Sequence, residues 1–145
     1  MGATFERRAT IAAWWTAFMF FYVYADILGF FDPKAMRQVI EGNMGFFGPA
    51  TDSLKLSVAV FLSIPPLMIP LSLVLTASRA QWTNIVIGVL YLLAALTTLT
   101  FPSSTHYKYF EILEAFCTVV IVRSAWTWRV HGGEAHTSEA ASAPS

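Results

Sequence analysis

The chain has 145 residues, of which 56% are hydrophobic, 15% aromatic and only 12% charged, and its formal net charge is zero. Soluble domains carry about 25% charged residues, so this composition excludes an ordinary soluble domain and indicates an integral membrane protein. Because the charge is balanced and no basic patch is present, nucleic acid is excluded as a partner.

Four apolar stretches account for nearly the whole chain, at residues 10–31, 53–76, 83–101 and 107–128. A bilayer core requires about 20 apolar residues per helix, and each stretch meets that length. The sequence therefore predicts an all-α fold, an integral membrane four-helix antiparallel bundle formed by one domain at residues 1–129. Residues 130–145 are a polar tail rich in Ser and Ala, which we expect to be disordered.

A short helix is predicted between the first two spans. Asp32 is typical of an N-cap and Pro33 of a first helical residue, and we expect Gly42 to end the helix after Glu41. Its apolar residues share one face, which predicts an amphipathic helix lying in the membrane interface. The connection from 32 to 52 is either a simple connector or a lid over a cavity, and Thr51 or Asp52 is expected to cap the second span.

The second span contains three prolines near its middle: Pro65, Pro66 and Pro70. Each lacks an N–H, so the helix is expected to kink, and the kink is either a hinge or a bend around neighbouring helices. Hydroxyl groups of three serines are available for the freed carbonyls: Ser57, Ser63 and Ser72.

The order of the spans sets the topology. Residues 77–82 are expected to form a tight connection that makes the second and third spans an antiparallel hairpin, with Trp82 at the interface. An even number of spans places both termini on one side of the membrane. Basic residues are divided almost evenly between the two sides, with a slight excess that favours termini in the cytoplasm. We expect a bacterial inner-membrane protein. Because the difference in basic residues is small, insertion in both orientations is also permitted, which would allow an antiparallel homodimer.

Carboxylates lie inside the first and last spans. Asp26 is in the first, and Glu111 and Glu114 are in the last. A charged side chain in hydrocarbon costs a few kcal/mol, so such residues normally face a bundle interior or a wet cavity. At about 1.5 Å per helical residue, all three occupy one layer of the membrane, in the half away from the termini. The sequence therefore predicts a polar seam between the first and last spans.

This seam is the predicted ligand-binding or proton-linked site. Glu111 and Glu114 are three residues apart on one helical face, where like charges favour a shared proton. Tyr22 and Tyr91 are the expected partners, and their rings suit a cation. The alternative is structural: the glutamates reach the interface, pair with Lys108 and hold helices together.

Other chemistries find no support in the residues. The lone Cys117 permits no disulfide, and no two of the three histidines can form a pair across the bundle. No catalytic motif, phosphate loop or metal-ligand set is present, so we expect no cofactor and no metal.

A resemblance appears at several of these positions. The stretch from Tyr22 to Asp32, the Ile64-Pro65 pair, the stretch 81–84, and Glu111 with the closing residues 125–128 resemble a family of small bacterial four-span proteins, domain-of-unknown-function family 6326. The family pattern has a glutamate before the Ile-Pro pair, where this chain has Ser63. The resemblance implies a four-helix membrane protein and brings no established activity.

A looser likeness concerns the emopamil-binding protein superfamily. Four spans, an acidic residue late in the first span (Asp26) and a proline in the second (Pro65) are similar to that superfamily. Its members hold sterol-like ligands in a central cavity, so this resemblance implies a cavity protein.

Three hypotheses follow. In the first, the protein binds or transports a small apolar or cationic molecule in an intramembrane cavity lined by the carboxylates. In the second, it is a structural or accessory subunit of a membrane complex. In the third, it is a lipid-modifying membrane enzyme that uses a buried carboxylate as general acid or base. The first is favoured, and an enzyme is the less expected outcome.

Overall fold

The computed structural model describes residues 2–128, so the predicted tail at 130–145 lies outside the described residues. The elements in chain order are α1 (Gly2–Gly29), α2 (Pro33–Ile40), the short 3-10 helix η1 (Gly45–Phe47), α3 (Asp52–Val74), α4 (Ala77–Thr98) and α5 (Thr105–Trp126). The fold is all-helical, as predicted.

Three helices are long and apolar enough to cross a membrane: Thr4–Gly29, Asp52–Val74 and Ala77–Thr98. The α5 helix has 22 residues, but four of them are charged: Lys108, Glu111, Glu114 and Arg123. These charges, in an otherwise apolar helix, are the reason that the fourth span stays a prediction.

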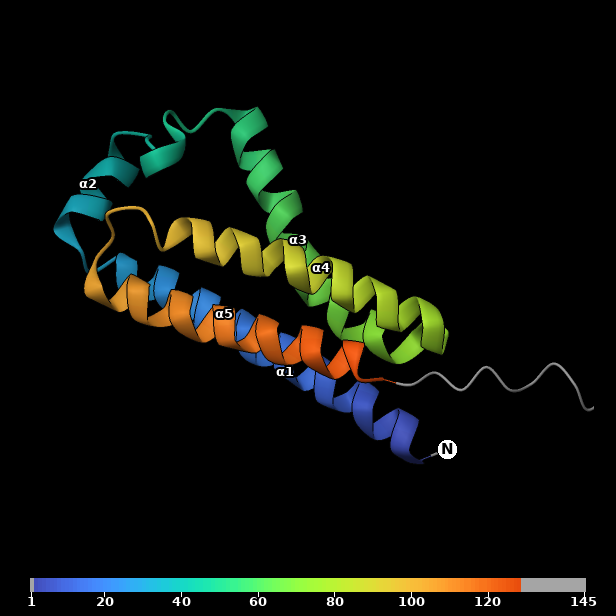
Figure 1. Cartoon of the computed structure of the whole chain (residues 1–145). Helices are drawn as coiled ribbons and strands as arrows, with labels where there is room; N and C mark the ends of the chain where they lie inside the picture. The colour runs from blue at the N-terminus through green and yellow to red at the C-terminus, as the bar shows by residue number, and fades with distance from the viewer. Residues whose placement is uncertain (1, 129–145) are drawn as a thin grey trace, which may run out of the picture.

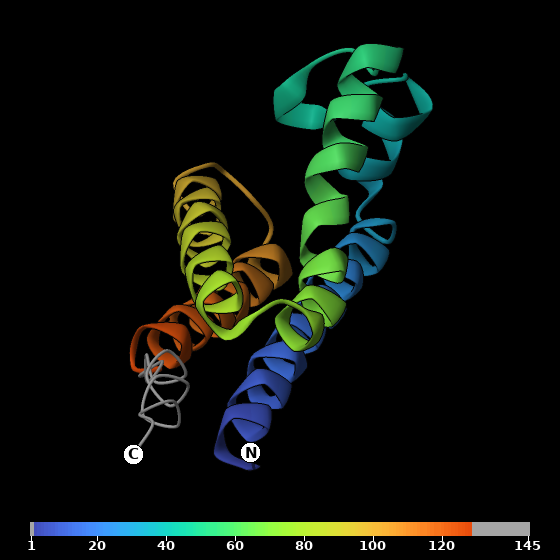
Figure 2. The same cartoon turned by 90° about the vertical axis from the view of Figure 1, so that its right-hand side faces the viewer.

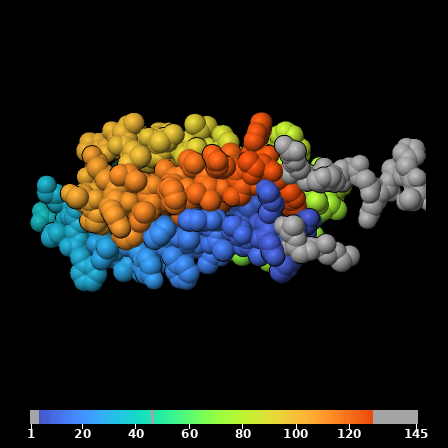
Figure 3. All heavy atoms as spheres, turned by 60° about the horizontal axis from the view of Figure 1, so that its bottom comes forward, coloured from blue at the N-terminus to red at the C-terminus, as the bar shows by residue number. Residues whose placement is uncertain are grey.

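The long helices run along one another. The α5 helix packs against both α1 and α4, and α3 packs mainly against α1. Figure 3 shows α1 and α5 side by side over much of their length. The start of α1 and the end of α5 lie together, which we call the terminal end (Figure 1). There, Nη1 of Arg7 donates a hydrogen bond to Oγ1 of Thr127 at 3.4 Å. The opposite end, which holds α2, is the loop end.

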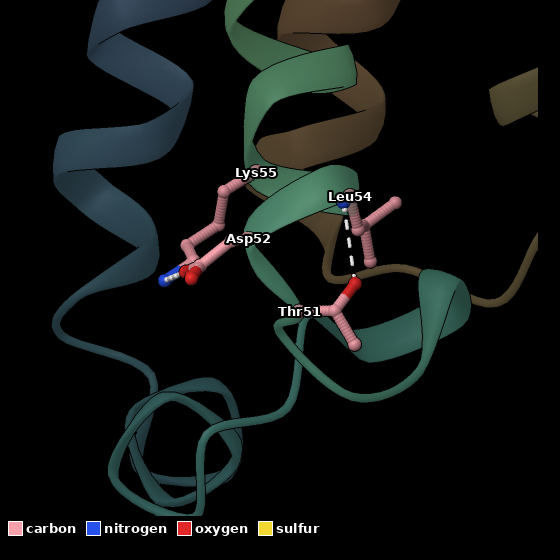
Figure 4. A network of polar contacts seen from close by, with 4 residues as sticks. All are labelled: Thr51, Asp52, Leu54 and Lys55. Carbon is pink, nitrogen blue, oxygen red and sulfur yellow. Dashed lines mark hydrogen bonds and ion pairs between the residues drawn. The ribbon is translucent and has the colours of Figure 1, made fainter.

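The capping residues of two helices follow the sequence signals. The Asp32 side chain accepts a hydrogen bond from the N–H of Lys34 at 2.9 Å, and Pro33 is the first residue of α2. Thr51 caps α3 by accepting from the N–H of Leu54 at 3.2 Å (Figure 4). No residue of α2 is buried against the bundle. Its predicted position in the membrane interface stays a prediction.

The predicted connection at 77–82 is wrong, because α4 begins at Ala77 and only Leu75 and Thr76 separate it from α3. The polar residues of this stretch mark the edge of the apolar run, not the start of the helix. Gln81 illustrates the difference: its Nε2 donates to the carbonyl oxygens of Ala125 and Trp128, at 3.0 and 2.8 Å. It thereby adds a second hydrogen bond to the Ala125 carbonyl, which also accepts from the N–H of Trp128 at 3.2 Å, and bonds the Trp128 carbonyl beyond the end of α5.

The α3 helix continues through its three prolines and changes direction along its course (Figure 1). Pro65 lacks an N–H, so the carbonyl of Phe61 loses its helical partner. The serines do not replace it. Ser63 donates to the Ala59 carbonyl, and Ser72 and Ser57 likewise bond the carbonyl four residues before them, none of which is freed by a proline. The hydroxyl of Tyr91 on α4 donates to the Phe61 carbonyl instead.

A polar junction lies inside the core and joins three helices. The indole N–H of Trp15 on α1 donates to Oδ1 of Asn84 on α4 at 2.7 Å. Oγ of Ser72 on α3 lies 3.0 Å from the same oxygen, so its single proton is shared between Asn84 and the Met68 carbonyl. All three side chains are at most 1% exposed. The core around them lies in the half of the bundle nearest the terminal end, and it includes Ile11 and Trp128.

Candidate functional site

The three predicted carboxylates lie near one another. Glu114 on α5 is only 6% exposed, and its charge interacts with those of Glu111 and Asp26. Asp26 on α1 is exposed, and Glu111 is half-buried. We call these three residues the carboxylate cluster. The predicted seam between α1 and α5 is therefore present in the structure.

Tyr107 joins the two helices of the cluster. Its hydroxyl donates a hydrogen bond to Oδ1 of Asp26 at 3.3 Å. Gly29, one turn after Asp26, makes room for it: a Cβ at that position would lie 2.6 Å from the Tyr107 hydroxyl oxygen. Tyr107 is four residues before Glu111, a spacing that places both on one face of α5, yet it is not among the predicted site residues.

Glu111 has an unsatisfied oxygen. Its Oε2 is buried and has no hydrogen-bond partner among the described residues. The rest of the carboxyl group interacts with Thr98 on α4 and, through charge, with Lys108 one turn earlier. A buried acceptor without a partner costs about 1–3 kcal/mol, so this oxygen is available to a ligand that carries a donor.

The two predicted tyrosines differ in position. Tyr22 is half-buried on α1 and interacts electrostatically with Asp26 and Glu114, so it borders the cluster. Tyr91 is 2% exposed and lies in the core, where its ring stacks on Phe61 with centroids 4.6 Å apart. Its hydroxyl is already bonded to the backbone of Phe61. Tyr22 therefore lies beside the cluster, whereas Tyr91 supports α3.

The predicted hinge residues all lie within α3. Pro65 is buried in the core, and Pro66 and Pro70 are exposed. Pro65 is one turn from Phe61, so the proline segment is linked through Tyr91 to the region beside Tyr22.

Acidic groups outnumber basic ones in the carboxylate cluster. Among residues 2–128, no group of histidine, cysteine, aspartate and glutamate side chains has a geometry that holds a metal ion. The ion pair found in the described part of the chain joins Lys55 to Asp52, at the start of α3. The cluster thus combines three acidic groups with one nearby cation, Lys108, which interacts with Glu111 alone.

Comparison with known proteins gives one match. A family of unknown function, DUF6326, matches residues 3–134. The chain belongs to the DUF6326 family. This confirms the resemblance seen at the stretch from Tyr22 to Asp32. No curated protein and no solved structure matches this DUF6326 member. The looser likeness to the emopamil-binding superfamily finds no match among these comparisons and stays an expectation.

Proposed function

We propose that this protein binds or transports a small apolar or cationic molecule within the membrane, with the carboxylate cluster supplying the counter-charge. The observation that carries the proposal is Glu114. Its carboxyl group is 6% exposed, and no cationic side chain of the described residues forms an ion pair with it.

The energetics favour a bound cation. On an insertion scale, an aspartate at the centre of a membrane helix costs about 2.5–3.5 kcal/mol. Glu114 also lies close to two further acidic groups, so its negative charge is opposed by theirs. A ligand with an ammonium group offsets both effects, because it pairs with the cluster and donates hydrogen bonds to it.

Two tyrosines suit such a ligand. Tyr22 is half-buried beside Asp26 and Glu114, so its ring supplies an aromatic face for a cation. Tyr107 holds Asp26 in place through its hydroxyl. The accessory-subunit hypothesis requires neither a ligand nor these tyrosines.

The proposal also includes location. We place the protein in the bacterial inner membrane with its termini in the cytoplasm, on the basis of its membrane-length helices and a slight excess of basic residues at the terminal end.

Thermal unfolding in lipid nanodiscs tests the proposal. The protein is mixed with a panel of hydrophobic ammonium ions and with neutral compounds of the same chain length. Wild type is compared with Asp26→Asn, Glu111→Gln and Glu114→Gln. The control is Glu6→Gln, which removes an exposed carboxylate near the terminal end, away from the cluster.

The expected result is stabilisation of wild type and Glu6→Gln by ammonium ions, and loss of that stabilisation in Glu114→Gln. If no compound stabilises wild type and the cluster variants unfold like it, the proposal is wrong. The accessory-subunit hypothesis then becomes the better one, and the search turns to protein partners.

A further inference from the structure

Packing differs between the two ends of the bundle. Buried residues of α3 are found only from Pro65 onward, and none of residues 52–60 is buried. On α4, the facing end is similar, because residues 96–98 are exposed. Figures 1 and 2 both show the first part of α3 rising away from α4. We call residues 52–64 the outer segment of α3.

The outer segment is held as a helix by local interactions. Thr51 caps the N–H of Leu54 at 3.2 Å, and Lys55 forms an ion pair with Asp52 at 2.7 Å (Figure 4). Asp52 also places a negative charge in the first turn, where the helix dipole favours it. The segment therefore keeps its helical form although only its C-terminal part, including Phe61 and Ile64, packs against the core.

One contact fixes the C-terminal end of this segment. Pro65 and Pro66 directly follow it and remove two backbone hydrogen bonds of the helix. Tyr91 bonds the Phe61 carbonyl and stacks on the Phe61 ring, at an interplanar angle of 23°. Kinks in helices occur at prolines, so this junction is the point at which α3 bends.

The junction borders the carboxylate cluster. The ring of Phe18 contacts both tyrosines, with its centroid 5.7 Å from that of Tyr91 and 6.1 Å from that of Tyr22. Tyr22 in turn interacts electrostatically with Asp26 and Glu114. The outer segment, which runs from this level to the loop end, is thus linked to the cluster through Tyr91, Phe18 and Tyr22. We propose that the outer segment is a movable wall of the carboxylate site, and that an amphipathic cation enters past it from the bilayer. This inference rests on the function proposed above.

Exposed apolar side chains on the outer segment and on α4 indicate which class of ligand the site would take. Leu56 and Val60 on the outer segment are 66% and 58% exposed, and Leu93 and Leu96 on α4 are 58% and 49% exposed. Apolar surface of this kind suits a hydrocarbon chain, while the cluster suits an ammonium head group. A ligand with both parts reaches the site from the lipid, whereas a small hydrophilic cation has to come from water.

Distance measurements between spin labels test the wall. Labels are placed at Val60 on the outer segment and Leu96 on α4, and at Leu67 and Val86 as a control pair in the packed half, 57% and 60% exposed. A Cys117→Ala background removes the native thiol. The protein is reconstituted in phosphatidylcholine nanodiscs, and the probes are dodecyltrimethylammonium and tetramethylammonium.

The expected result is a broad Val60–Leu96 distribution that dodecyltrimethylammonium shifts and narrows, with no shift in Glu114→Gln and none with tetramethylammonium. Tyr91→Phe, which removes the bond to Phe61 and retains the ring, is expected to broaden this distribution without any ligand. The Leu67–Val86 distances should stay unchanged throughout.

Three results would overturn the inference. If tetramethylammonium acts as strongly as its dodecyl analogue, entry from the bilayer is wrong while the proposed function stands. If thermal unfolding reports binding that depends on the cluster but the Val60–Leu96 distances never move, the movable wall is wrong. If neither probe binds in either assay, the proposed function falls and this inference falls with it.

Discussion

The hydroxyl of Tyr91 donates a hydrogen bond to the carbonyl of Phe61, the carbonyl that Pro65 leaves without its helical partner. Two helices are thus coupled at the position where one of them lacks a backbone bond. In hydrocarbon, no water replaces that bond, so the neighbouring helix has to supply it.

The first prediction concerns this bond. Tyr91→Phe is expected to lower the free energy of unfolding by about 1 kcal/mol, because the Phe61 carbonyl loses its partner while the ring contacts remain. In a Pro65→Ala background the backbone N–H is restored, so the same change should cost much less. Unfolding in detergent micelles measures both, with Tyr109→Phe, an exposed position, as control. Equal costs in the two backgrounds would contradict the account.

The second prediction concerns the polar junction of the core. Asn84→Ala removes the acceptor of Trp15 and Ser72 and leaves a buried indole N–H without a partner. We expect a loss of about 1–3 kcal/mol. Trp15→Phe removes the donor, so Asn84→Ala should be less harmful in that background. Additive losses in the double variant would show that the two side chains are not coupled.

The third prediction concerns the contact between α4 and α5. A Cβ at Gly88 would lie 2.7 Å from Cγ2 of Val122, in a buried interface. Gly88→Ala should therefore destabilise the protein by about 1–3 kcal/mol through overpacking. Val122→Ala should restore much of the loss when combined with it. A fully stable Gly88→Ala protein would mean that the two helices are farther apart than described.

The fourth prediction distinguishes an effect on ligand binding from an effect on the stability of the protein. Gly29→Ala places a methyl group against the Tyr107 hydroxyl, which is the far end of a side chain and moves easily. We expect little change in unfolding, but weaker binding of hydrophobic ammonium ions, to the same extent as in Tyr107→Phe. Binding titrations of both variants and of the double variant provide the measurement. A further loss in the double variant would mean that Gly29 acts by another route.

The sequence predicted the helical fold and the meeting of Asp26 with Glu111 and Glu114, because depth in the membrane and helical periodicity follow from residue number. The same depth argument applies to Tyr91 and Pro65, which lie near the middle of adjacent spans. Their contact is not predicted, because a tyrosine and a proline, unlike a charge, need no polar partner in hydrocarbon that would indicate a pairing.

Other features depend on tertiary contacts that residue patterns do not report. Asn84 is an amide at the edge of an apolar stretch, and its partners Trp15 and Ser72 come from two other helices. The start of α4 is predicted several residues too late, because polar residues such as Gln81 are typical of a loop, and their partners at the end of α5 come from tertiary contacts. Gly29 has a role only once Tyr107 is known to lie above it.

The most direct test of the central claim is the dissociation constant of a hydrophobic ammonium ion in nanodiscs at pH 7, for wild type, Asp26→Asn, Glu114→Gln and Glu6→Gln. We predict that each change in the cluster weakens binding by about tenfold, equivalent to about 1.4 kcal/mol, and that Glu6→Gln binds like wild type. Equal dissociation constants for all four proteins would contradict the claim that these carboxylates form a cation site.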